Sequence, residues 1–202
     1  LGDSSVLDFF KQRVVDKCPP NTLMAFSKNI DVDSFNSEQL HKIKGEIRSY
    51  RAIDDGFEPY LSNLQKNCLC PEILKLKVGA QVMLLKNMVQ EDLYNGSIGI
   101  VTRLNKDSVE VDFSGNLVQI NSDEWKIEEN FIDQAGKVKT KVLARRSQIP
   151  LKIAYAITVH RLQGMTVDKV CVDLGGCFEC GQLYCALSRA RTLEGLYILN
   201  LK

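Results

Sequence analysis

The chain has 202 residues, of which 45% are hydrophobic and 25% charged, and its formal net charge is +1. This composition is that of a globular protein with a substantial core, and it excludes both a disordered chain and a strongly basic one. No apolar run approaches the roughly 18 residues of a membrane span, so we expect no membrane contact, and any nucleic-acid contact must come from local patches of charge. The chain starts Leu1-Gly2-Asp3, without an initiator methionine. We therefore expect a piece of a longer protein.

The first part of the chain combines helical patterns with one short apolar run. The spacing of apolar residues predicts a helix over residues 4–17, which Pro19-Pro20 would end. The run Leu23–Phe26 predicts a buried strand, and a second helix is expected after a cap at Asp31 or Asp33. Together these elements predict an α/β beginning.

The middle of the chain reads as short strands separated by turns. Turn residues such as Asn95-Gly96 recur about every ten residues, which is typical of a small antiparallel barrel. We therefore expect a β insert within residues 78–142, with Trp125 partly buried, after the weak signals of residues 46–70. The predicted strands are Gln81–Leu85, Ile98–Leu104, Ser108–Phe113 and Leu117–Ile120.

The α/β character resumes near Ile149. The apolar run Leu151–Val159 fits a buried strand or a buried helix, and its periodicity does not decide between them. Beyond it, strand, helix and strand are predicted in turn. A strand–helix–strand order with apolar strands is typical of a parallel sheet covered by helices. These three elements are Val167–Leu174, Gln182–Ala190 and Leu196–Leu201.

One polar cluster follows the apolar run, at residues Thr158–Thr166. It precedes a predicted strand, where parallel sheets place their ligand-facing loops. Its hydrogen-bonding side chains suit a chain of phosphates, and Gly164 would let the backbone approach a ligand closely. A polar connecting loop without a ligand is the alternative interpretation.

A second polar cluster closes the segment Tyr184–Arg191, where Arg189 and Arg191 follow an apolar stretch. A guanidinium is a permanently charged fork that suits phosphate or carboxylate. The alternative is a helix end at which the arginines offset the helix dipole. The chain has no phosphate-binding G-x-x-x-x-G-K-[ST] motif of its own.

Two further features allow alternatives. In a strand, Lys137, Lys139 and Lys141 would share one face, as a track for a nucleic-acid backbone or as a solvated edge. Seven cysteines, several inside apolar runs, indicate reduced and buried thiols in an intracellular protein. A zinc site is the less favoured reading, as is a redox pair at Cys177 and Cys180. The four candidate zinc ligands are Cys68, Cys70, Cys177 and Cys180.

Two motifs stand in order in the last quarter of the chain. H-[KR]-x-Q-G-x-T is present as His160–Thr166, and G-Q-x-Y-x-A-L-S-R-A follows a predicted strand as Gly181–Ala190. In this order they resemble the Pif family of DNA helicases, in superfamily 1B. Three upstream segments also resemble that family: Phe26–Asn29 its motif IV, Leu76–Asn87 the start of its SH3-like insert, and Arg146–Leu151 the return from the insert.

The resemblance implies an α/β fold in which a RecA-like parallel sheet domain carries a small antiparallel β-barrel of SH3-like type. Residues 1–73 and 148–202 would form the second RecA-like domain of a motor, and residues 74–147 the insert. The family's first RecA-like domain holds the Walker lysine and the acids that bind magnesium. We therefore expect the chain to be inactive alone and to partner a first RecA-like domain of the same protein.

The resemblance also assigns roles to residues. It implies a 5′-to-3′ DNA helicase that uses ATP and Mg²⁺, with Arg189 as the arginine finger and no metal site in this chain. Gln163, Gly164 and Arg189 would contact ATP. Single-stranded DNA is the implied partner of a monomeric motor, and the residues expected to bind it are Lys28, Asn29, Thr158, His160, Arg161 and Thr166.

Two residues depart from the family's pattern. Arg161 replaces the usual lysine and keeps its charge, whereas Leu162 replaces the usual serine and removes a hydroxyl. The rival hypothesis is a non-catalytic module that binds nucleic acid or protein. The resemblance further implies roles among DNA repair, recombination and telomere maintenance, and an intracellular location, in the nucleus or mitochondrion if the organism is eukaryotic.

Overall fold

The computed structural model describes residues 10–20, 22–26, 29–132, 136–175 and 181–200, without the side chains of residues 29–31 and 182–183. The start of the helix expected at residues 4–17 lies outside this part. Within it, helical residues end at Lys11, and Val14 forms a parallel bridge to Ile198. The predicted helix therefore runs too far. The backbone N–H of Val15 donates to the carbonyl of Ile198 and so makes no helical hydrogen bond.

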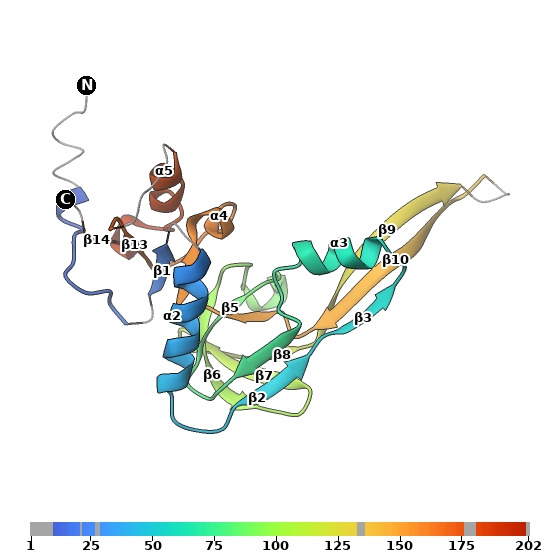
Figure 1. The fold of residues 1–202 in the computed structure, drawn as a ribbon, viewed down its shortest axis with the longest axis horizontal. Helices are drawn as coiled ribbons and strands as arrows, with labels where there is room; N and C mark the ends of the chain where they lie inside the picture. The colour runs from blue at the N-terminus through green and yellow to red at the C-terminus, as the bar shows by residue number, and fades with distance from the viewer. Residues whose placement is uncertain (1–9, 21, 27–28, 133–135, 176–180, 201–202) are drawn as a thin grey trace.

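A parallel sheet forms the α/β part of the chain (Figure 1). Its order is β12–β1–β13–β14, and all neighbouring strands are parallel. Alternate residues of β1 enter the two apolar cores on opposite faces of the sheet, which is why its strands read as continuous apolar runs. The predicted parallel sheet is confirmed, and its strands are β1 (Leu23–Phe26), β12 (Ala156–Thr158), β13 (Val170–Asp173) and β14 (Leu196–Leu199).

Helices flank this sheet. The predicted second helix begins earlier than its expected cap, at α2 (Asn29–Lys42). The ambiguous run Leu151–Val159 divides into strand β11 (Leu151–Ile153), strand β12 and the start of a short helix, so both of its readings were partly right. The short helices near the C-terminus are α4 (Val159–Leu162), α5 (Gln182–Leu187) and the 3₁₀ turn η2 (Leu193–Gly195).

The predicted β insert contributes strands β5 to β8 to an antiparallel five-stranded sheet in the order β11–β5–β6–β7–β8, whose edge strand β11 lies beyond the predicted end of the insert at residue 147. Two of its strands have the predicted bounds, because apolar and polar residues alternate along them. A two-stranded ladder of β2 and β4 closes its core, which includes Leu74, Leu76 and Ile120. The strands are β2 (Arg48–Arg51), β4 (Ile73–Leu76), β5 (Gln81–Leu84), β6 (Ile98–Leu104), β7 (Ser108–Phe113) and β8 (Asn116–Asn121), with the 3₁₀ turn η1 (Val89–Glu91) after β5.

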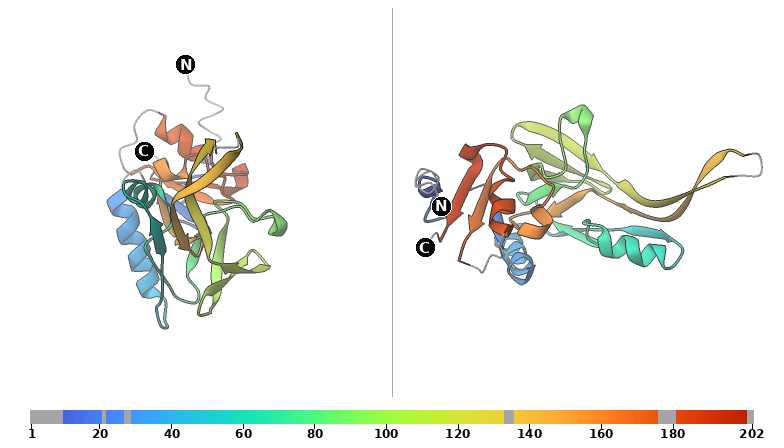
Figure 2. Two further views of the ribbon diagram at one scale, coloured as in Figure 1. Left: turned by 90° about the vertical axis from the view of Figure 1, so that its right-hand side faces the viewer. Right: turned by 90° about the horizontal axis from the view of Figure 1, so that it is seen from above.

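A long hairpin of β9 (Asp123–Ile132) and β10 (Val138–Gln148) projects from the insert as an arm (Figures 1 and 2). Strand β3 (Ile53–Gly56) pairs with the base of β10, and helix α3 (Tyr60–Asn67) packs on it. Trp125 is partly buried, as expected, with the Lys86 ammonium 4.8 Å from its ring centre.

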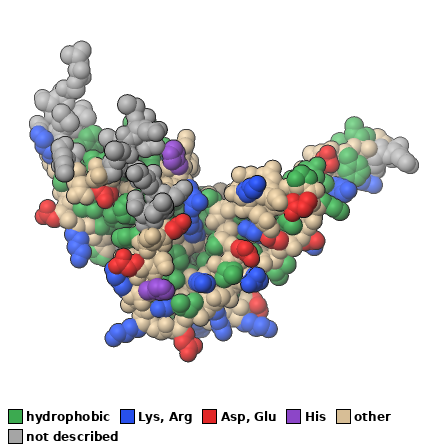
Figure 3. Space-filling view, viewed as in Figure 1, with side chains coloured by type: hydrophobic (Ala, Val, Ile, Leu, Met, Phe, Trp, Pro, Cys, Tyr) green, Lys and Arg blue, Asp and Glu red, His purple; other side chains and the backbone are tan. Residues whose placement is uncertain are grey.

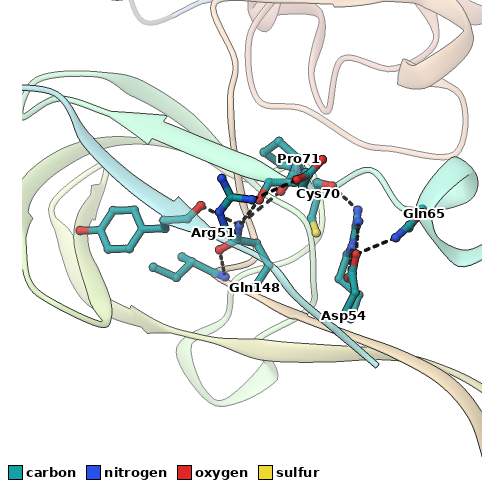
Figure 4. A network of polar contacts seen from close by, with 10 residues as sticks. Arg51, Asp54, Gln65, Cys70, Pro71 and Gln148 are labelled. Atoms are coloured by element: carbon teal, nitrogen blue, oxygen red, sulfur yellow. Dashed lines mark hydrogen bonds and ion pairs between the residues drawn. The ribbon is translucent and has the colours of Figure 1, made fainter. Parts of the chain in front are cut away.

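The base of the arm is fixed by a buried polar network (Figure 4). Arg146, only 5% exposed, donates two hydrogen bonds of 2.7 Å to the Asp54 carboxylate, which keeps the pKa of Asp54 below its usual value. Gln148 donates to the carbonyls of Tyr50 and Pro71 at 3.0 and 3.2 Å. These hydrogen bonds join β2 and β3, which precede residue 74, to β10, which follows it. The predicted domain boundary at residue 74 stays a prediction.

Candidate functional site

The first polar cluster forms the α4 helix and the loop after it, at the carboxyl end of β12. Thr158 is buried and caps α4, because its hydroxyl oxygen accepts the backbone N–H of Arg161 at 3.4 Å. His160, Arg161 and Gln163 are exposed on the surface. The parallel sheet therefore presents three polar side chains where such sheets bind ligands.

The loop continues through two more predicted site residues, Gly164 and Thr166, both exposed. Gly164 has φ +80°, and a Cβ there would meet nothing within 4 Å, so its backbone conformation alone favours glycine. Leu162 points the other way and is fully buried in the core of the parallel sheet. Position 162 therefore faces the core, and the replacement of serine by leucine takes no hydroxyl from the exposed face of the loop.

The second polar cluster lies beside this loop. Val167 forms a parallel bridge with Ala190, donating to the carbonyl of Arg189 at 3.0 Å and accepting from the N–H of Arg191 at 2.8 Å. The two motifs, separated along the chain by β13, are thus joined by direct backbone hydrogen bonds. Gly181, with φ +90°, is the N-cap residue just before α5, and this helix ends one residue before Ser188.

The two arginines of this cluster have different surroundings. The Arg189 guanidinium donates to the Ser188 hydroxyl, at 3.0 Å from Nη2 and 3.3 Å from Nε, and it forms no ion pair within the described part of the chain. Arg191 pairs with the Asp168 carboxylate at 3.2 Å. Arg191 therefore has an acidic partner within the chain, whereas Arg189 has none among the described residues and keeps its charge available for an anion from outside the chain.

A groove of about 470 Å³ separates α4 from the base of the arm, and Figure 3 shows basic side chains around this hollow. Arg161 of α4 lines it on the side of the parallel sheet, Lys152 lines it from β11 of the antiparallel sheet, and Lys66 and Arg146 line it on the side of the arm. Burial lowers the pKa of Lys152, and the nearby Arg161 lowers it further. Lys152 was missed in the sequence, although a lysine inside an apolar run was a usable signal.

The remaining predicted contacts are only partly described. Lys28 lies outside the described residues, and Asn29 is the first residue of α2, without a described side chain. The basic stripe of the arm includes Lys139, which pairs across the hairpin with Phe131, and Lys141, whose ammonium lies 5.5 Å from the Phe57 ring centre. Both readings of this stripe stay predictions.

Five cysteines in the described residues are free thiols: Cys18, Cys68, Cys70, Cys171 and Cys185. A hydrogen bond from the Cys70 thiol lowers the pKa of Cys68 to about 6. Cys177 and Cys180, needed for the zinc and redox alternatives, lie outside the described part. Elsewhere in the described ranges, no three or more His, Cys, Asp or Glu side chains form a metal-binding group. None of the described helices is long and apolar enough to cross a membrane.

The chain has a parallel sheet with polar loops at the carboxyl ends of its strands, and an antiparallel insert interrupts that sheet along the sequence. This arrangement places the chain in the RecA-like class with a β insert. Comparison with known proteins shows which family the chain resembles. The protein family described as "DNA helicase Pif1, 2B domain" matches residues 59–104 of the chain. The ATP-dependent DNA helicase PIF1 of Danio rerio is 39% identical over 176 residues, which are 84% of this chain and 26% of that protein.

Solved structures agree with this assignment. Pif1 helicase from Bacteroides sp in complex with ADP-AlF4 superimposes with a TM-score of 0.86 at 30% identity, covering 98% of this chain and 45% of that one. Bacteroides Pif1 bound to ssDNA gives a TM-score of 0.66 at 31% identity, covering 97% and 45%. The resemblance to the Pif helicase family and the RecA-like fold with its insert are thereby confirmed. The chain spans about a quarter of the length of the curated relative and under half of the solved chains.

Proposed function

We propose that the chain is the second RecA-like domain, with its insert, of an ATP-dependent 5′-to-3′ DNA helicase. Its task in ATP hydrolysis is to supply Arg189 to a nucleotide site that a first RecA-like domain completes. The observation that carries this proposal is the contrast between Arg191, paired with Asp168, and Arg189, held only by the hydroxyl of Ser188 within the described residues. Relatives named ATP-dependent DNA helicases, and a neighbour solved with ADP-AlF4, support it.

The chemistry of phosphoryl transfer explains why an arginine is suited to this position. Negative charge on the γ-phosphate oxygens must be stabilised in the transition state, and an arginine finger contributes roughly 10³–10⁵ in rate in related systems. Gln163 and Gly164 lie on the loop whose next residues hold the Arg189 backbone, so we assign them to the same ATP site. Mg²⁺ would be held mainly by the first domain.

The groove between α4 and the arm is the proposed path of single-stranded DNA. Arg161 and Lys152 supply positive charge there, and Asp33 and Glu72 limit the net charge of the lining. His160 and Thr166 are exposed on the same α4 loop and would contact the strand near the nucleotide site. A Bacteroides Pif1 structure bound to ssDNA supports a strand partner, and the motor is proposed to be a monomer.

We expect the chain to bind single-stranded DNA weakly, with little sequence preference and with strong dependence on salt. Each phosphate contact contributes about 0.7 to the slope of log affinity against log salt for single strands. Arg161→Ala is expected to weaken binding about threefold to tenfold at low salt. It should also make that slope shallower by about 0.7, the contribution of one phosphate contact. Fluorescence anisotropy with a labelled oligonucleotide at several salt concentrations measures both quantities.

The matched control is Lys106→Ala, in the exposed turn between β6 and β7 and outside the residues that line the groove. It removes the same charge and should leave affinity within about twofold, because contacts in this mode are local. Equal losses in the two variants, or binding that ignores salt, would show that the groove is not the path of the strand.

A further inference from the structure

The turn of residues 94–97, here called the insert turn, is rigidly attached to strand β5 of the insert. The backbone N–H of Gly96 donates to the Leu84 carbonyl, and the N–H of Leu84 donates to the Ser97 carbonyl, both at 2.9 Å. The N–H of Asn95 donates to the Asn87 side chain at 2.8 Å. The position of the insert turn is therefore set by the β-barrel.

The tip of this turn presses against the α4 loop of the RecA-like domain. Gly96 is buried, with φ +102°, and a Cβ built on it would lie 3.1 Å from the Thr166 carbonyl oxygen. The same Cβ would lie 3.5 Å from Met165 Cβ and 3.8 Å from Val167 Cγ1. Because the closest of these atoms belongs to the backbone, it cannot rotate away from an added side chain.

Val167, which follows Thr166, is hydrogen-bonded to the backbone of the segment that carries the proposed arginine finger. Val167 donates to the carbonyl of Arg189 at 3.0 Å and accepts from Arg191 at 2.8 Å. Val167 is only 1% exposed, so this segment has little freedom to move without carrying the finger segment with it. The insert turn thus lies next to the Thr166 backbone, and Val167, the following residue, holds the segment of Arg189 and Arg191 by one pair of hydrogen bonds.

We propose that Gly96 is a positioning residue for Arg189: its missing side chain lets the insert turn support Thr166 and Val167, and that support sets where the Arg189 guanidinium stands. The inference rests on the proposed function, since it concerns the same nucleotide site. Displacements well below 1 Å matter in such sites, because catalysis depends on the alignment of charge with the transition state. The insert therefore acts on ATP hydrolysis from outside the nucleotide cleft.

The test is Gly96→Ala in the full-length protein, with Gly115→Ala as its matched control. Gly115 has a similar φ, +97°, but a Cβ there meets nothing within 4 Å, so the control shares the backbone strain without the contact. We expect Gly96→Ala to lower kcat for ATP hydrolysis about tenfold, with the ATP KM within about twofold. Gly115→Ala should keep kcat within about twofold, and melting curves report the folding of both variants.

A double substitution separates positioning from a general structural effect. If Gly96 acts through Arg189, the variant Gly96→Ala/Arg189→Ala hydrolyses ATP no more slowly than Arg189→Ala alone. A further tenfold loss in the double variant, or equal losses in Gly96→Ala and Gly115→Ala, would overturn the inference. Full turnover in Arg189→Ala alone would instead overturn the proposed finger.

A second variant covers the case in which Gly96→Ala does not fold. Ser97→Ala adds no atoms but removes the hydroxyl that accepts the Tyr94 N–H at 3.1 Å, which loosens the insert turn. We expect about a threefold loss in kcat, absent when Arg189 is already alanine. An unchanged kcat in Ser97→Ala would count against the positioning role.

Discussion

Arg189→Ala in the full-length protein is expected to lower kcat for ATP hydrolysis by about 100-fold or more, with affinity for single-stranded DNA nearly unchanged. The charge of this residue acts most strongly when the γ-phosphate acquires transition-state charge, and less when ATP is merely bound. DNA affinity is spared because Arg189 is not among the residues that line the proposed strand groove. Steady-state ATPase rates with saturating single-stranded DNA, beside a DNA titration, measure both effects.

Two neighbouring substitutions serve as controls. Arg189→Lys should recover little activity, because an ammonium on a flexible stem does not reproduce the planar fork. Arg191→Ala should cost much less, since its partner Asp168 is 60% exposed and an ion pair of this kind contributes little. Retention of more than half of the wild-type turnover in Arg189→Ala, or greater damage from Arg191→Ala, would show that the finger is assigned to the wrong residue.

Leu162→Ser is expected to destabilise the protein by about 3–5 kcal/mol, although serine is the usual residue of the family at this position. Leu162 is fully buried and packs in the core with Leu23, Val159 and Met165. The substitution removes most of a buried leucine side chain and places a hydroxyl among apolar atoms. Urea unfolding of the wild-type chain and the variant, followed by circular dichroism, gives the difference in unfolding free energy.

The neighbouring Gln163→Ser is the control, since Gln163 is exposed and its side chain belongs to no core cluster of the described residues. Its unfolding free energy should change by less than about 0.5 kcal/mol. A loss below about 1 kcal/mol in Leu162→Ser would mean that this core relaxes around the smaller side chain.

The fold was predictable where a regular alternation of residues and a buried face coincide. Strands β6 and β7 have the predicted bounds, because alternation along them separates a buried face from an exposed one. The arm of β9 and β10 was missed as a structural element. Its outer residues are exposed on both faces, so charged residues such as Glu128 and Lys139 interrupt any apolar pattern. Pairing between two such strands is a long-range property that single segments do not encode.

In the candidate site, too, local features could be predicted from the sequence and long-range contacts could not. Motif order was enough to single out Arg189 and the α4 loop, because their residue types and spacing are local properties of the sequence. The structure adds the hydrogen bonds between Val167 and the segment of Arg189 and Arg191, and the contact between Gly96 and Thr166. Both join segments that are distant in the chain, and their distances follow from tertiary packing rather than from sequence pattern.

Strand separation by the full-length protein would show whether it is a 5′-to-3′ helicase that depends on Arg189. Three labelled duplexes of the same sequence would be compared with ATP and Mg²⁺: one with a 5′ single-stranded tail, one with a 3′ tail and one with blunt ends. We expect ATP-dependent unwinding of the 5′-tailed duplex, little unwinding of the other two, and loss of unwinding in Arg189→Ala. Unwinding of the 3′-tailed duplex alone, or of none of the three under conditions in which ATP is hydrolysed, would contradict this expectation.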